Sequence, residues 1–278
     1  MSRKSYRVKF EGGSGFELAG IIDRPDTTAA VPVLVLSHCF TCNKDLKAIV
    51  RISRALAERG IAVLRYDMTG LGGSSGDFSQ TNFSTNVADL KAAIAFADAE
   101  VGDVHALMGH SFGGAASLAV ASEFSSDVNN KLCCVIALAA PSDTSHLASL
   151  LLRMNPAIEV DGEGEVSIGG IRWQIDSQMV ADFRSHRLAD LITNIRIPTL
   201  VMHSPVDETV GFDHALRIMS LINQSEASEA DASAPSKSKP LCSLASLDGA
   251  DHLLAQHAHD IEYVSDLAAA MVRRYCRP

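Results

Sequence analysis

The sequence has no apolar run that approaches the length of about 18 residues needed to cross a membrane. Its first residues, MSRKSYRVKF, are basic but lack the apolar segment of a secretory signal. Basic residues are also in deficit, since 24 Lys and Arg stand against 33 Asp and Glu, a formal net charge of −9. This charge argues against nucleic acid or an anionic membrane surface as a partner. We therefore expect a cytoplasmic protein without a membrane span.

Cysteine is sparse for a chain of 278 residues, and aromatic residues make up only 5% of it. The six cysteines do not form the dense, regular framework of a small disulfide-rich domain: Cys39, Cys42, Cys133, Cys134, Cys242 and Cys276. Two of them lie inside the apolar run LCCVIALAA, where free cysteine behaves as a small hydrophobe. The composition is otherwise that of a soluble globular protein, and the length allows a sizeable core.

Short apolar runs alternate with longer helical patterns along the chain, which is typical of βαβ units and a mostly parallel sheet. Residues 6–12 and 16–23 resemble two antiparallel opening strands joined by a glycine-rich turn. Further apolar runs predict buried strands at 31–38, 61–67, 104–110, 132–140, 197–203 and 241–248. Helical spacing predicts helices at 46–59, 83–100 and 113–124. We expect one α/β domain over residues 1–278, with helices flanking a central sheet.

The alternation breaks down between residues 141 and 196. SHLASLLLRM and VADFRSHRLADLI have helical patterns, and EVSIGGIRWQID between them resembles a hairpin. An insertion of this size between two buried strands is interpreted as a small cap over the sheet. Its apolar residues either line a pocket or form the core of the cap: Leu150, Leu151, Met154, Trp173, Ile175 and Phe183. A second irregular segment, 225–240, is rich in Ser, Ala and Pro and is expected to be a flexible surface loop.

The strongest chemical signal is MGHSFGG at residues 108–114, which fits the pattern Gly-x-Ser-x-Gly. It follows a predicted strand and precedes a predicted helix of small residues. This context favours a nucleophile elbow, a tight turn that needs residues without bulk at positions 109 and 113. The turn would lift the Ser111 hydroxyl to the edge of the sheet, beside a helix N-terminus that favours negative charge. A plain glycine-rich turn is the alternative.

A serine hydroxyl becomes a good nucleophile when a base removes its proton and an acid orients that base. The chain order Ser, acid, His resembles the arrangement of α/β hydrolases. Asp207 and His252 follow predicted strands on the same edge as Ser111, which makes these three residues the candidate catalytic set. Asp143 also follows a strand and is the alternative acid. Other histidines at strand ends are expected to hydrogen-bond loop backbones: His38, His110 and His203.

Longer blocks extend this resemblance over about residues 6–275. SHCFTCNKD, RISRALAERGIAVLRYDMTGLGGSSGDF, GHSFGGAA and SLDGADHLL together resemble one bacterial group of α/β hydrolases. Members of that group are often fused to an OsmC-like domain, whereas this chain ends at RRYCRP without such a sequence behind it. The resemblance implies the same triad, Ser111, Asp207 and His252.

The segment SHCFTCNKD, residues 37–45, follows the first parallel strand, where α/β hydrolases carry the loop that supplies an oxyanion-hole amide. The family usually has His-Gly-x there, and this chain has His38-Cys39-Phe40. We expect the amides of Phe40 and Phe112 to form the oxyanion hole. The sequence has no second Cys or His pair at zinc-finger spacing, which argues against a metal site. A redox brake, in which Cys39 and Cys42 oxidise and distort this loop, is the alternative role for the two cysteines.

A glycine-rich loop, DMTGLGGSSGDF at residues 67–78, raises the question of phosphate binding. It lacks the Lys-Ser/Thr ending of a P-loop and the features of a dinucleotide fingerprint. We interpret it as a turn-rich rim of the active site, in which Arg65 and Asp67 are structural. No cofactor and no metal are expected.

The sequence therefore predicts a serine hydrolase, most simply a carboxylesterase that cleaves small to medium acyl esters or thioesters. The same triad could serve a C–C bond hydrolase, a peptidase or an acyltransferase. Two further alternatives come from other classes of protein. One is a binding module with an idle triad, and the other is a thiol-based redox protein that works through Cys39 and Cys42.

Overall fold

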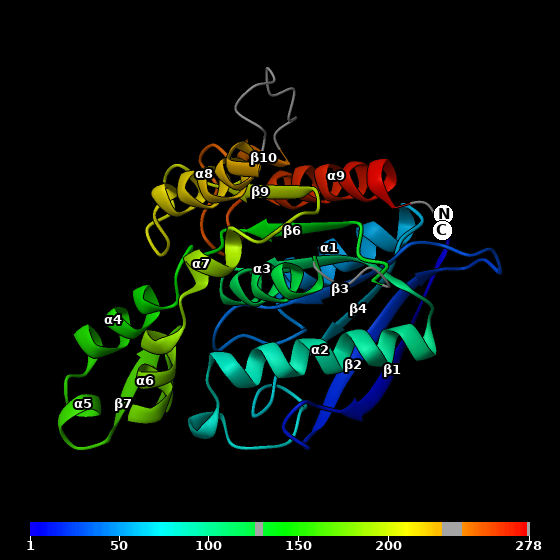
Figure 1. The fold of residues 1–278 in the computed structure, drawn as a ribbon. Helices are drawn as coiled ribbons and strands as arrows, with labels where there is room; N and C mark the ends of the chain where they lie inside the picture. Colours follow the sequence, from blue (N-terminus) through cyan, green and yellow to red (C-terminus); the bar gives the residue numbers. More distant parts are fainter. Residues whose placement is uncertain (126–129, 230–240, 277–278) are drawn as a thin grey trace.

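The computed structural model describes residues 1–125, 130–229 and 241–276. An eight-stranded sheet runs through this part of the chain in the order β1-β2-β4-β3-β5-β6-β9-β10 (Figure 1). Its strands are β1 (Arg3–Glu11), β2 (Glu17–Pro25), β3 (Val33–Ser37), β4 (Ala62–Tyr66), β5 (Val104–His110), β6 (Cys134–Leu138), β9 (Thr199–His203) and β10 (Cys242–Ser246). β2 pairs antiparallel with β1 and with β4, and the strands from β4 to β10 pair in parallel. The predicted mostly parallel sheet and its antiparallel opening are confirmed.

Helices cover both faces of the sheet, as the sequence predicts (Figure 1). α1 (Lys47–Glu58) and α9 (Ala258–Tyr275) share one hydrophobic cluster with the sheet. α2 (Phe83–Glu100), α3 (Phe112–Phe124) and α8 (Phe212–Glu229) belong to the cluster on the other face. α3 is buried over almost its whole length because it lies between the sheet, α2 and α7 (Leu188–Ile192). Its small apolar residues suit a helix that is enclosed on every side.

The insertion between β6 and β9 contains several short elements. They are α4 (Ser145–Met154), α5 (Ala157–Val160), β7 (Glu163–Ile168), β8 (Ile171–Asp176), α6 (Ser177–Ser185) and α7. Among the apolar residues singled out from the sequence, Leu151, Ile175 and Phe183 are fully buried in the main core cluster, whereas Met154 is exposed. The burial favours a core role for these three side chains.

The cap differs from the sequence prediction at one point, since the helix expected over 180–192 is divided into α6 and α7. The backbone is extended at His186, whose Nε2 lies 2.9 Å from the hydroxyl of Ser84 at the start of α2. The ring of His186 also lies edge-on to that of Phe83. These contacts with a distant helix explain the break, which no local pattern in the sequence records.

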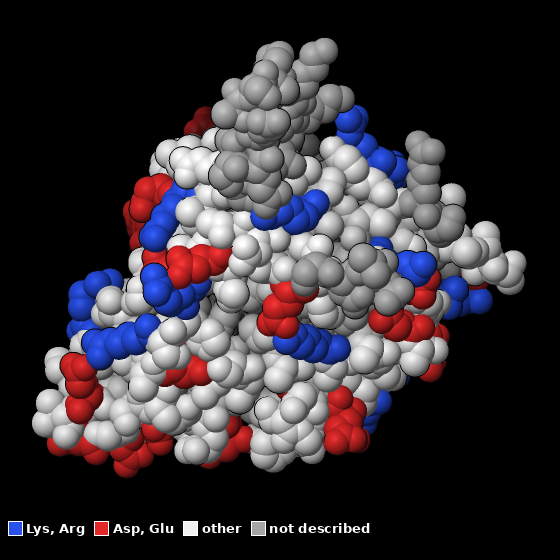
Figure 2. Space-filling model, viewed as in Figure 1, with Lys and Arg blue, Asp and Glu red and all other residues white. Residues whose placement is uncertain are grey.

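The end of α8 overlaps the segment 225–240, which the sequence predicts to be a flexible surface loop. The helix runs to Glu229, so residues 225–229 are helical, and residues 230–240 lie outside the described part of the chain. Among the described residues, no helix is long and apolar enough to span a membrane. The excess of acidic residues is visible at the outer end of the cap (Figure 2), where the exposed side chains of Glu159, Asp161, Glu163 and Glu165 lie in and around α5 and β7.

Candidate active site

Ser111 occupies a strained turn between β5 and α3. Its φ is 54°, in the left-handed region that non-glycine residues rarely adopt, and its N–H donates to Leu138 O at 2.8 Å. The neighbouring glycines leave no room for side chains. A Cβ on Gly109 would lie 2.1 Å from Gly113 O, and one on Gly113 would lie 2.4 Å from His38 O. The close approach of these backbones explains why the motif needs glycine on both sides of the serine.

The structure brings together the three residues that the sequence nominates as nucleophile, base and acid. His252 Nε2 lies 3.0 Å from Ser111 Oγ, and His252 Nδ1 lies 2.7 Å from Asp207 Oδ2. The residues come from the turns after β5, β9 and β10, which end at the same edge of the sheet. The distances are those of a hydrogen-bonded relay from carboxylate to imidazole to hydroxyl.

The environment of Asp207 favours its carboxylate form. Burial alone would raise its pKa, but the hydrogen bond and charge of His252 and the backbone N–H groups of Val210 and Thr209 outweigh burial, so the pKa lies below its usual value. Those N–H groups donate to Oδ1 at 2.9 and 2.8 Å. His203 also holds this loop, since its Nε2–H donates to Val210 O at 2.8 Å. The Asp207 carboxyl is therefore ionised and held by its own loop.

His110, which precedes Ser111, supports the loop that carries His252. Its Nε2–H donates to His252 O at 2.7 Å. Burial, followed by the nearby charge of His252, lowers the pKa of His110 to about 3, so its imidazole is neutral near pH 7. The expectation that His110 and His203 hydrogen-bond loop backbones is confirmed.

The alternative acid, Asp143, lies in a different environment. Its Oδ1 accepts from the hydroxyl of Ser145 at 2.6 Å and from the N–H of His146 at 2.9 Å, at the start of α4. Its Oδ2 lies 3.2 Å from Arg217. Asp143 thus binds the backbone at the start of α4 and pairs with Arg217, while Asp207 contacts the imidazole of His252.

The loop after β3 has a backbone orientation set by His38. The N–H of Met68 donates to His38 Nε2 at 3.2 Å, so the ring proton lies on Nδ1, which donates to Cys39 O at 2.8 Å. In a trans peptide the carbonyl and the following N–H point in opposite directions, so the Phe40 N–H points away from His38. Phe112 is the first residue of α3, and such N–H groups have no partner within their helix.

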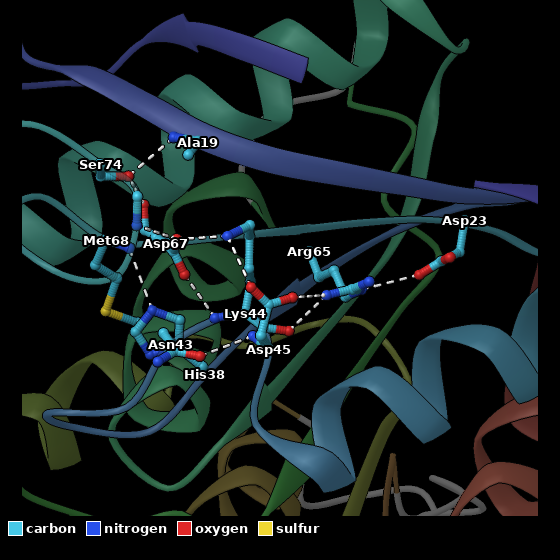
Figure 3. A network of polar contacts seen from close by, with 11 residues as sticks. Ala19, Asp23, His38, Asn43, Lys44, Asp45, Arg65, Asp67, Met68 and Ser74 are labelled. Carbon is cyan, nitrogen blue, oxygen red and sulfur yellow. Dashed lines mark hydrogen bonds and ion pairs between the residues drawn. The ribbon is translucent and has the colours of Figure 1, made fainter. Parts of the chain in front are cut away.

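A buried polar network holds the other end of this loop (Figure 3). Asp67 Oδ1 accepts from the N–H of Lys44 at 2.6 Å, and Oδ2 accepts from Lys44 Nζ at 2.9 Å and Gly73 N at 2.7 Å. Arg65 donates to Lys44 O at 2.7 Å and to Asp23 at 2.9 Å. The structural role predicted for Arg65 and Asp67 is confirmed, since both tie the loop to the sheet.

Cys39 and Cys42 are joined by a disulfide in this loop, with their Cα atoms 5.4 Å apart. The sequence raises oxidation of these two cysteines only through the redox-brake hypothesis, and in the structure they are paired. The spacing of three residues fits a four-residue turn from Cys39 to Cys42, in which the N–H of Cys42 donates to Cys39 O at 3.2 Å. Among the described residues, no group of three or more His, Cys, Asp or Glu side chains could hold a metal ion.

Aromatic side chains surround Phe40, and the sequence did not reveal this cluster. The Phe40 ring lies 5.3 Å from Phe78, 5.5 Å from Phe112 and 6.0 Å from Phe183, measured between ring centroids. Trp173 of the cap hairpin lies 4.8 Å from Phe78. The cluster links the loop after β3, the elbow and the cap, so the cap meets the site at Phe40.

Comparisons with known proteins agree with this architecture. The family described as Serine aminopeptidase, S33, matches residues 30–165. The esterase domain of a Rhodothermus marinus protein is 35% identical, with a TM-score of 0.72 over 99% of this chain and 100% of that one. Est1E from Butyrivibrio proteoclasticus, solved with ferulic acid, is 19% identical, with a TM-score of 0.74 over 96% of this chain and 99% of that one, and shows the fold alone. A comparison with curated proteins found no match.

The chain belongs to the α/β-hydrolase family, because its similarity to the Rhodothermus esterase domain spans nearly its whole length. The predicted fold class is confirmed, and hydrolysis is the class of chemistry that the relatives support.

Proposed function

We propose that this hydrolase is a serine carboxylesterase that cleaves small to medium acyl esters or thioesters through an acyl-enzyme. One observation carries the proposal: His252 bridges the hydroxyl of Ser111 and the ionised carboxylate of Asp207 at hydrogen-bond distances. The similarity to an esterase domain supports ester bonds as the target. We further propose that the relatives of this chain include the hydrolase half of proteins that are fused to an OsmC-like domain.

In the proposed mechanism, Ser111 Oγ attacks the acyl carbonyl while His252 Nε2 takes the hydroxyl proton. Asp207 keeps the imidazole in the tautomer that can accept this proton and stabilises the imidazolium that forms. The N–H groups of Phe40 and Phe112 bind the oxyanion, each contributing about 3 kcal/mol to the transition state. His252 then protonates the leaving alcohol and later activates the water that hydrolyses the acyl-enzyme.

The second candidate is a peptidase, which the description of the matching family favours. Both reactions use the same acyl-enzyme, so the leaving group distinguishes them. The leaving group of an ester is an alkoxide, which is easily protonated. The leaving group of an amide is an amine, which needs complete proton transfer from His252 before the bond breaks. Parallel assays on matched ester and anilide substrates with the same acyl group therefore separate the two candidates.

The first test is hydrolysis of p-nitrophenyl esters from acetate to dodecanoate by the wild type and by Ser111→Ala. We expect cleavage by the wild type and a loss on the order of 10⁴-fold or more in the variant. Ser265→Ala is the matched control, because it removes a hydroxyl that is buried in α9 and donates to Ile261 O. It should keep wild-type kcat. An active Ser111→Ala enzyme would exclude this serine as the nucleophile, and faster anilide cleavage would favour the peptidase.

A further inference from the structure

The disulfide between Cys39 and Cys42 lies across the peptide that carries the proposed oxyanion donor. Cys39 O accepts two hydrogen bonds, from His38 Nδ1–H at 2.8 Å and from Cys42 N–H at 3.2 Å. Both bonds fix the plane of the peptide whose other end is the Phe40 N–H. The bridge joins the first and last residues of the same turn. The orientation of this one amide therefore depends on a turn that two sulfur atoms hold closed.

The turn contains a strained residue. Thr41 has a φ of 59°, in the left-handed region, where a β-branched side chain is rarely found. Such a conformation persists only where its surroundings impose it. The bridge is the covalent constraint that spans Thr41, and the bond from Cys42 N–H to Cys39 O is the hydrogen bond that closes the same turn. Opening the bridge removes the covalent part and lets Thr41 return to an ordinary backbone conformation.

The chain on either side of the turn is anchored independently of the bridge. His38 is fully buried and held by Met68, and Lys44 is held by Asp67 and Arg65 (Figure 3). A change in the bridge is thus confined to residues 39–43 and does not loosen the sheet. The conformational consequence is concentrated on Phe40.

We propose that Cys39 and Cys42 form a thiol–disulfide exchange site, at which a thiol or dithiol reductant switches the oxyanion loop from an active disulfide form to a less active dithiol form. The inference rests on the proposed esterase function. It reverses the sign of the redox brake considered from the sequence, because the ordered relay of Ser111, His252 and Asp207 and the fixed Cys39 carbonyl coexist with the closed bridge.

The exchange proceeds in two displacements. A thiolate of the reductant attacks Sγ of Cys42, which is half-buried, whereas Cys39 is only 3% exposed. The bridge breaks, a mixed disulfide forms at Cys42, and Cys39 leaves as a thiolate that takes up a proton. A second reductant thiolate attacks the reductant sulfur of the mixed disulfide, and Cys42 leaves and is protonated. Two electrons and two protons pass to the protein, the reductant becomes a disulfide, and a small disulfide such as oxidised glutathione reverses the reaction.

The test compares the wild type after incubation with dithiothreitol or with oxidised glutathione. Alkylation and mass spectrometry report the state of Cys39 and Cys42 in each sample, and ester hydrolysis reports kcat and KM. We expect kcat to fall about 10-fold in the dithiol form, with KM within about twofold, because loss of a full oxyanion donor costs 10²–10³-fold and a mobile donor is only partly lost. The double variant Cys39→Ser/Cys42→Ser should have the lower kcat under both conditions. Cys133→Ser, which changes a half-buried cysteine outside the loop, should respond as the wild type does.

Three results would overturn the proposal: equal kcat in two forms that alkylation distinguishes, a higher kcat in the dithiol form, or a pair whose state neither reagent changes. Failure of the esterase proposal is recognised separately, as absence of ester cleavage in both forms. In that case the rate of Ser111 labelling by a fluorophosphonate replaces hydrolysis as the readout. Slower labelling of the dithiol form supports the exchange site, and equal labelling overturns it.

Discussion

Asp207 uses its two carboxylate oxygens for different tasks: Oδ2 binds His252 Nδ1 at 2.7 Å, and Oδ1 accepts the N–H groups of its own loop. The loop therefore orients the Asp207 carboxylate, and the carboxylate orients the imidazole of His252, which is the base of the proposed mechanism. A substitution at Asp207 can therefore disturb His252 while the backbone of the loop keeps its conformation.

Asp207→Asn is expected to lower kcat by about 10⁴-fold with little loss of stability. The amide oxygen can still accept from Thr209 and Val210, but the amide nitrogen then faces His252 Nδ1 and favours the wrong tautomer. The measurement is ester hydrolysis together with chemical denaturation. Asp143→Asn, the same change at the other acid, should leave kcat within roughly twofold. A large loss in the Asp143 variant would reassign the acid.

His38 is expected to act as a positioning residue for the Phe40 amide. His38→Ala should lower kcat about 10-fold or more, since the donor that fixes Cys39 O is lost. His38→Asn should recover part of the loss, because its side-chain N–H₂ can occupy the place of Nδ1–H. Steady-state kinetics on one ester, with KM measured separately, tests this. Equal kcat in the Ala and Asn variants would rule out the donor as the reason.

Asp23 and Arg65 form a buried ion pair, with 2.9 Å between Arg65 Nε and Asp23 Oδ2. Asp23→Asn is expected to lower the free energy of unfolding by about 3 kcal/mol, since it removes the buried carboxylate that pairs with Arg65 and leaves the guanidinium only the exposed carboxylate of Asp45, at 2.9 Å. The exposed pair of Arg184 and Glu159 is the contrast, and Glu159→Gln should cost less than about 1 kcal/mol. Urea denaturation at pH 7 measures both. Similar losses in the two variants would contradict the role of burial.

The pH dependence of Asp23 has a defined sign. Burial raises the pKa of its carboxyl, but hydrogen bonds from Ser5, Ser53 and Arg65 and the charge of Arg65 outweigh burial and bring the pKa below 3.8. The contribution of Asp23 to stability is therefore present above its ordinary pKa and is lost as the pH falls through its lower folded pKa. The stability difference between wild type and Asp23→Asn should thus shrink in acid below pH 3.8. A constant difference would show that the charge is not the cause.

Burial of His110 is expected to cause a second loss of stability in acid, at a higher pH than the loss caused by Asp23. The pKa of His110 falls from 6.5 to about 3, chiefly through burial, so the unfolded chain binds a proton below pH 6.5 that the folded protein does not. Stability should therefore decline as the pH falls from 6.5 towards 3, by up to about 1.4 kcal/mol per pH unit for this residue. His110→Gln should flatten the decline, and His259→Gln, at a site 96% exposed, should not. Equal slopes in all three proteins would contradict this account.

Much of the fold could be predicted from the sequence because the signals are local. Parallel strands buried on both faces appear as continuous apolar runs, and the elbow requires glycines within four residues of one another. The boundaries of α2 agree with the prediction, Phe83–Glu100, because Asn82 and Thr85 form a capping box at its start. The chain order Ser, acid, His then sufficed to nominate three residues that the structure brings within hydrogen-bond distance.

The features that escaped prediction depend on contacts between distant segments. The break at His186 follows from Ser84, which lies 102 residues away in sequence. The ring contacts of Phe40 require the cap and the elbow to be folded already. For the two cysteines, spacing alone was compatible with a free pair, a metal site or a bridge, and the geometry of the turn decided among these.

The insertion between β6 and β9 leaves and re-enters the sheet at neighbouring positions, since Val135 to Leu138 pair directly with Thr199 to Met202. The insertion therefore begins and ends on neighbouring strands of the sheet. An insertion of another length can begin and end at the same positions, so the pairing of β6 with β9 does not depend on its length. We therefore expect the insertion to vary between related proteins more freely than the strand ends from which Ser111, Asp207 and His252 project.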